Sequence, residues 1–209
     1  MQNVLSILFC LSLFYLVVTT SVKSYISVLR MQGVLLVILM ILPFIPDFSI
    51  FGLVLPLTML VVKVILIPRY MEKIMNDLNI KREIESTLQQ FNFLLLSCFS
   101  MAVIFIVSNY LSKSTEFAVI PFATAFSAVT IGIYIIMFRK KLIVHVIGFL
   151  VLENGIFMFG LAVASEFPII IELGSLLDVF AVVFLMGIAI NKISSTIFTD
   201  DRQAQRRDP

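Results

Sequence analysis

The sequence predicts an all-α integral membrane protein with seven transmembrane helices, an N-terminus outside the membrane and a cytoplasmic C-terminus. The first observation is composition, since 60% of the 209 residues are hydrophobic and only 13% are charged. Soluble globular domains contain about 45–50% apolar and roughly 25% charged residues. A chain this short cannot bury the excess inside itself, so much of its apolar surface must face lipid. The other two observations are a series of long apolar segments and the placement of basic residues between them.

Seven apolar segments follow one another, and most reach the roughly 20 residues that a helix needs to cross a bilayer. The first is too long for the core of a secretory signal and has no small-residue cleavage site, so we interpret it as a retained span. Pro43 and Pro46 suit a turn after the second, and Pro121 lies in the first turn of the fifth. The segments are Val4–Val22, Leu29–Ile45, Phe48–Ile67, Phe91–Asn109, Phe117–Phe138, Leu142–Ser165 and Ile169–Asn191.

The basic residues determine the predicted orientation. Lys113 lies in a loop on one side of the membrane and Lys63 lies within an apolar segment, whereas all the others lie on the opposite side. Because basic residues stay in the cytoplasm, the side that holds most of them is cytoplasmic. These residues are Lys23, Arg30, Arg69, Lys73, Lys81, Arg82, Arg139, Lys140, Lys141, Lys192, Arg202, Arg206 and Arg207.

The spans divide the chain into four parts. Residues 1–90 form a three-helix segment with a cytoplasmic loop, 91–116 the fourth helix, 117–191 a second three-helix segment, and 192–209 a polar cytoplasmic tail. Within the loop, Met71, Ile74, Met75 and Leu78 recur at i, i+3, i+4 and i+7, which predicts an amphipathic helix. That helix either extends the third transmembrane helix or offers a docking surface for a partner.

Two carboxylates lie deep in the last two spans. Glu153 is eleven residues after Leu142, about 16 Å along a helix, and Asp178 is nine residues after Ile169, about 14 Å. In a hydrocarbon core of roughly 30 Å both lie close to the midplane. The short connection between these spans makes the two helices antiparallel neighbours. A carboxylate at this depth is costly unless it is paired, protonated or hydrated, so its default interpretation is functional.

Two roles remain open for Glu153 and Asp178. Groups that exchange a proton would serve a proton relay, which two carboxyls at one depth on adjacent helices favour. The alternative is structural, because a protonated carboxyl can hydrogen-bond between helices. Asn154 and Gly155 fit either role, as an interhelical hydrogen bonder and a position of close helix approach.

Lesser candidates lie around the carboxylates. Lys63 either extends its ammonium to the membrane interface or pairs with a buried carboxylate. His145, near the cytoplasmic mouth of the sixth span, either hands protons inward or has a structural role. Glu172, in the first turn of the seventh span, suits the helix dipole as well as a functional role. Ser175 belongs to a small, partly polar stripe suited to tight packing or a file of waters.

Several classes of function lack their sequence signals. The chain has no Gly-rich phosphate loop, no Ser-His-Asp or Cys-His set, and no basic–aromatic patch for nucleic acid. Its single histidine and two cysteines, Cys10 and Cys98, show no metal-ligand spacing. We therefore expect no catalytic residues, no metal and no cofactor in this chain, which instead conducts, couples or scaffolds.

Three runs resemble component E of hydrogenase-4 type complexes. They are His145–Gly155, with its Glu-Asn-Gly, the run from Ile171 to Val183 around Asp178, and Lys63–Pro68. In that family the last three helices are similar to the three-helix K-type subunit of respiratory complex I, which has two intramembrane glutamates in its proton path. Here the second is an aspartate, and the first lies about one helical turn later, which keeps it on the same face.

The resemblance implies a membrane subunit of a group 4 nickel–iron hydrogenase complex, such as a formate hydrogenlyase, in the inner membrane of a prokaryote. The NiFe centre and the Fe–S clusters would lie on soluble partner subunits. Antiporter-like membrane subunits and a membrane anchor subunit would flank this chain in the lipid bilayer. No nucleic-acid partner is expected, because the chain lacks a basic–aromatic patch.

Three hypotheses follow. The first is a non-catalytic subunit of such a complex that translocates protons or sodium ions through its carboxylates. The second is a purely structural subunit that links antiporter-like modules, or a subunit of a related cation antiporter or complex I-like assembly. The third, a free-standing seven-helix carrier, is disfavoured because the chain has no obvious inverted repeat.

Overall fold

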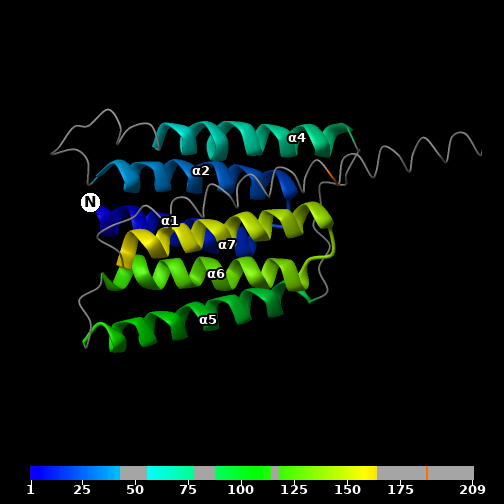
Figure 1. The fold of residues 1–209 in the computed structure, drawn as a ribbon. Helices are drawn as coiled ribbons and strands as arrows, with labels where there is room; N and C mark the ends of the chain where they lie inside the picture. The colour runs from blue at the N-terminus through cyan, green and yellow to red at the C-terminus, as the bar shows by residue number, and fades with distance from the viewer. Residues whose placement is uncertain (43–55, 78–87, 114–117, 164–186, 188–209) are drawn as a thin grey trace, which may run out of the picture.

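The computed structural model describes residues 1–42, 56–77, 88–113, 118–163 and 187. All regular elements in these ranges are helices, which pack side by side as a bundle (Figure 1). α6 packs against α7, α5 and α1, whereas α2 packs against α1, α7 and η2. The helices are α1 (Gln2–Val18), α2 (Val22–Ile41), η2 (Leu60–Leu66), α4 (Ile67–Asp77), α5 (Gln90–Leu111), α6 (Val119–Phe138) and α7 (Leu142–Val163).

The predicted all-helical class is confirmed, and four described helices are long and apolar enough to cross a membrane. They are α2, α5, α6 and α7, while α1 is apolar but shorter. The third predicted span is helical from residue 56 to residue 77. The seventh, Ile169–Asn191, lies outside the described residues apart from residue 187. The count of seven spans, their orientation and the four-part division stay predictions.

The third helix contains an irregular section, η2. Over Leu60–Leu66 the backbone follows a π-helix, and the N–H of Ile67 donates to the carbonyl of Val62, five residues earlier. Pro68 explains why the regular ladder fails here, because a proline ring has no N–H and clashes with the carbonyl four residues before it. The wider turn accommodates the proline without ending the helix. It also places Lys63, inside this section, among buried side chains.

The helix continues beyond the predicted span. α4 follows η2 directly and reaches Asp77, and the side chains of Met71, Ile74 and Met75 are buried. α4 packs against α2, so the first interpretation of this loop, an extension of the third helix, is confirmed as far as Asp77. Leu78 lies outside the described residues.

Glycines bring α6 and α7 into close contact. A Cβ added at Gly132 would lie 2.7 Å from the carbonyl oxygen of Gly148 and 2.7 Å from the amide nitrogen of Leu152. At Gly155 it would lie 2.8 Å from the amide nitrogen of Val129. Small residues let helix backbones approach in this way in membrane bundles. The predicted role of Gly155 as a position of close approach is therefore confirmed.

The outer helices present apolar side chains outward. α5 exposes Phe91, Leu95, Phe99, Val103, Ile106, Val107, Tyr110 and Leu111, and α1 exposes Val4, Ile7, Leu8, Leu11, Phe14, Tyr15 and Val18. Apolar surface of this extent is unfavourable in contact with water, whereas contact with lipid carries no such cost. Within the described residues, the surface therefore suits a chain whose bundle lies in a membrane.

Candidate functional site

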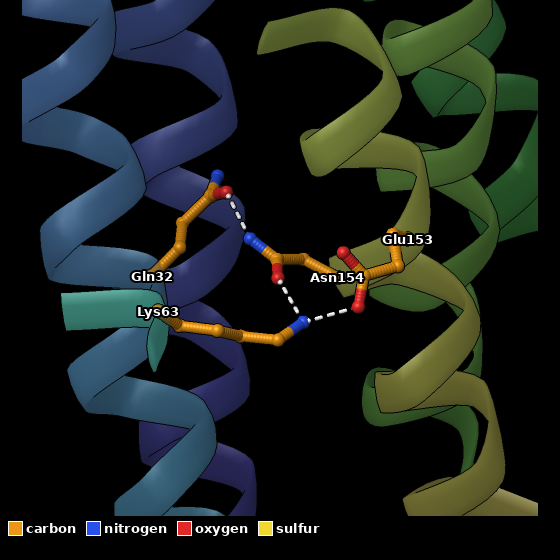
Figure 2. Close-up of polar contacts among 4 residues, drawn as sticks. All are labelled: Gln32, Lys63, Glu153 and Asn154. Carbon is orange, nitrogen blue, oxygen red and sulfur yellow. Dashed lines mark hydrogen bonds and ion pairs between the residues drawn. The ribbon is translucent and has the colours of Figure 1, made fainter. Parts of the chain in front are cut away.

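The candidate site is an ion pair buried between η2 and α7. Lys63 Nζ lies 2.5 Å from Glu153 Oε1, and the side chains are 5% and 1% exposed, respectively. The two residues are 90 positions apart in the sequence and meet in the interior of the bundle (Figure 2). Glu153 lies at the middle of α7, as its sequence position predicted. Lys63 therefore pairs with a carboxylate and does not extend to the interface, which decides between its two interpretations.

Two amides and a hydroxyl extend the ion pair across the bundle. Lys63 Nζ also donates to Asn154 Oδ1 at 3.0 Å, and Asn154 Nδ2 donates to Gln32 Oε1 at 3.2 Å (Figure 2). Gln32 Nε2 in turn donates to Ser12 Oγ at 3.0 Å, and Ser12 donates to the carbonyl of Phe9. The result is a continuous buried polar chain through α7, η2, α2 and α1, which we call the buried network.

The surroundings of the ammonium are otherwise apolar. The ring of Phe157, one turn after Glu153 on α7, has its centroid 5.8 Å from Lys63 Nζ, within the range of a cation–π contact. A low local dielectric strengthens the attraction between Lys63 and Glu153 and raises the cost of leaving either charge alone. Each of the two charges is therefore stabilised mainly by the presence of the other.

A small cavity adjoins the buried network. Its volume is about 10 Å³, and it is lined by Leu29, Lys63, Ile67, Leu150 and Asn154. That volume is about the minimum that holds one water molecule, and the ammonium and the amide supply polar partners for it.

The structure brings together some of the predicted residues. Glu153, Lys63 and Asn154 form one cluster, and Gly155 lets α7 approach α6 beside it. Asp178, Glu172 and Ser175 lie outside the described residues. Among the described residues, no group of three or more His, Cys, Asp or Glu side chains is placed to hold a metal ion.

His145 belongs to a different part of the bundle. Its Nε2 donates to the backbone carbonyl of Arg139 at 2.5 Å, next to the end of α6. That contact joins the first turn of α7 to the last turn of α6. Of the two interpretations of His145, the structure therefore favours the structural one.

A second polar cluster, which the sequence did not predict, surrounds Arg139. Its side chain is buried, its Nη1 donates to Gln90 Oε1 at 3.0 Å, and its guanidinium carbon lies 4.3 Å from the centroid of the Phe93 ring. Gln90 also donates through Nε2 to the carbonyls of Val17 and Val18 at the end of α1. Gln90 thus ties α1 to α6 at one end of the bundle.

Replacing Gln90 by alanine is expected to destabilise the protein by about 1–2 kcal/mol, because a buried guanidinium loses its amide acceptor. Thermal denaturation of the detergent-solubilised chain measures the effect. Gln89→Ala is the matched control, since Gln89 is exposed and directly precedes it. Equal melting temperatures for the two variants would contradict the bridging role of Gln90.

Two members of the buried network, Gln32 and Ser12, were missed from the sequence. Gln32 is an amide within a predicted transmembrane helix, and such a residue is uncommon enough in hydrocarbon to be a signal by itself. Ser12 offers no comparable signal, because a serine in an apolar helix commonly bonds its own backbone. Its contact with Gln32 depends on how α1 and α2 face each other.

Comparisons with known proteins found one partial relative and no family. No protein-family model matches the chain, and no solved structure matches it. The chain is similar to the uncharacterized protein Rv0085 of Mycobacterium tuberculosis, at 32% identity over 87 residues. The match covers 40% of this chain and 39% of that protein, so the similar region is less than half of either.

Proposed function

We propose that the chain is a non-catalytic membrane subunit of a complex I-like group 4 hydrogenase and that Lys63 and Glu153 take part in ion translocation. The buried ion pair is the observation that supports this proposal. Both of its side chains are buried, and they lie on different helices. The resemblance to component E of hydrogenase-4 type complexes supplies the class of assembly, with NiFe and Fe–S centres on soluble partners.

The energetics favour a functional role for the pair. Removing two charges from water costs several kcal/mol per ion, and well-packed apolar residues often stabilise as much as a buried pair does. In a membrane, ionisable residues that face the bundle interior mark ion and proton pathways. Lys63 and Glu153 fit that description because each is buried and each has its partner within hydrogen-bonding distance.

The geometry suits transfer of a proton along a hydrogen bond. Transfer from Lys63 Nζ to Glu153 Oε1 converts an ion pair into a neutral amine and a neutral carboxylic acid, with no net charge moved into the bilayer. Asn154 accepts a second hydrogen bond from Lys63 and so holds the nitrogen in place in either state. The cavity beside Lys63 is where a water would deliver or remove the proton.

The proposal extends to the topology and to the second carboxylate. Seven spans with a cytoplasmic C-terminus would put the connection between α6 and α7, with Arg139, Lys140 and Lys141, in the cytoplasm of a prokaryotic cell. Asp178 would be a second relay group at the depth of Glu153. Antiporter-like membrane subunits and a membrane anchor subunit would be the neighbours in the inner membrane.

A structural role is the second candidate, and the buried network favours it. Hydrogen bonds between Asn154, Gln32 and Ser12 join three helices, and such contacts contribute about 0.6 kcal/mol each on average in membrane proteins. In that case the chain would link antiporter-like modules without conducting. Loss of assembly with no separate loss of coupling in Glu153 variants would identify this role.

Co-purification in mild detergent tests the assignment to a complex. A tagged chain is expected to bring down antiporter-like membrane subunits and a nickel–iron large subunit, identified by mass spectrometry. A tagged chain without the predicted C-terminal span, residues 169–209, serves as a control for nonspecific capture. A chain that purifies alone and transports ions in liposomes would contradict the proposal and support a free-standing carrier.

A further inference from the structure

The groups around Lys63 Nζ are those that a bound alkali cation uses. A carboxylate oxygen of Glu153 lies at 2.5 Å and an amide oxygen of Asn154 at 3.0 Å. Hard cations prefer oxygen ligands of this kind, with water completing the coordination. The ring of Phe157 covers the ammonium on another side, and the cavity next to it has room for about one water. We call these groups the oxygen cage.

The amide oxygen of the cage is held in place by contacts that do not involve the lysine. Asn154 is fixed by its hydrogen bond to Gln32, which is fixed in turn by Ser12. That arrangement turns the nitrogen of the Asn154 amide toward Gln32 and its oxygen toward Lys63 (Figure 2). Glu153 is the adjacent residue on α7. The Asn154 oxygen therefore keeps its direction through the buried network. Glu153 Oε1 lies close to it, and the ammonium occupies the position that both oxygens contact.

We propose that Lys63 excludes alkali cations from this site by occupying the oxygen cage with its own ammonium. The chain thus contains a latent sodium site that appears only when the ammonium is removed. The inference deepens the proposed function, because it names the ion that moves at Glu153 as a proton and not sodium. That consequence for transport rests on the proposed function. The cage itself is a property of the chain and does not depend on hydrogenase partners.

Sodium-dependent stability of the purified full-length chain tests the inference. The Lys63→Ala variant is expected to gain a rise in melting temperature of roughly 5 °C or more in sodium chloride over choline chloride at equal ionic strength. The wild-type chain is expected to show no difference between the two salts. The rise should disappear in Lys63→Ala/Glu153→Gln, because the carboxylate is the charged ligand.

Lys63→Met is the matched control. Methionine keeps an unbranched side chain that fills the same space without a charge, so this variant should show no sodium dependence. A folded Lys63→Ala variant that is indifferent to sodium would overturn the inference. If Lys63→Ala folds in neither salt, the wild-type chain still decides, because stabilisation of wild type by sodium would overturn the inference and its absence would support it.

This outcome is independent of the test of the complex. Sodium binding is measured on the single chain, whereas co-purification reports on its partners. A chain without hydrogenase partners can still show the latent site, and a chain in a hydrogenase complex can still lack it. Failure of one proposal is therefore distinguishable from failure of the other.

Discussion

Replacing Lys63 by methionine is expected to destabilise the protein by about 3–5 kcal/mol, which is the usual cost of removing one partner of a buried ion pair. The carboxylate of Glu153, which is 1% exposed, would lose the Lys63 ammonium beside it. Asn154 would also lose the donor that its amide oxygen accepts from. Thermal or denaturant unfolding of the solubilised chain measures the change.

The double variant Lys63→Met/Glu153→Gln provides the control. With both charges removed, most of the lost stability should return, because neither position then leaves a charge without its partner. A double-mutant cycle then gives the coupling between the two side chains. Additive losses, with the double variant as unstable as the sum of the two single variants, would contradict a direct ion pair.

Replacing Gly132 by alanine is the second large effect expected. The new Cβ would lie 2.7 Å from backbone atoms of Gly148 and Leu152 on α7, which cannot move without separating the helices. Overpacking of this kind costs about 1–3 kcal/mol, in spite of the better helix propensity of alanine. The expected result is a lower melting temperature, with the site between α7 and η2 disturbed as α7 shifts.

Gly33→Ala is the matched substitution for comparison. A Cβ there would meet the side-chain atoms Cγ2 of Val64 at 3.1 Å and Cβ of Lys63 at 3.4 Å, and the Val64 methyl can rotate away. The gain in helix propensity is the same in both variants, so their difference isolates the backbone clash. A melting temperature for Gly132→Ala at or above that of Gly33→Ala would contradict the close packing of α6 and α7.

The sequence predicted the helices best where contact with lipid alone determines their position. Long apolar segments predicted α5, α6 and α7 closely, because any helix in hydrocarbon must satisfy its backbone internally. The apolar span was predicted to end at Ile67, and the spacing of the apolar residues after it predicted the helix that continues to Asp77. Proline usually marks a helix boundary, and the π-helical turn before it is a tertiary accommodation that periodicity does not reveal.

The sequence predicted some residues of the site, but it did not predict which of them contact one another. Glu153 and Lys63 were identifiable because charges in apolar segments are rare and costly. Their pairing was left open, since it depends on which faces η2 and α7 present to each other. The contact of Gln32 with Asn154 was not predicted for the same reason. The predicted companion of Glu153, Asp178, lies outside the described residues, so their relative placement stays a prediction.

The most direct test is ion coupling in the proposed hydrogenase complex when Glu153 is replaced by glutamine. Glutamine keeps the size of the side chain and can hydrogen-bond to Lys63, but it cannot carry a proton. We predict that membrane vesicles with the assembled Glu153→Gln complex retain hydrogen-evolving activity while coupled proton translocation falls to background. Normal translocation by the fully assembled Glu153→Gln complex would contradict the account.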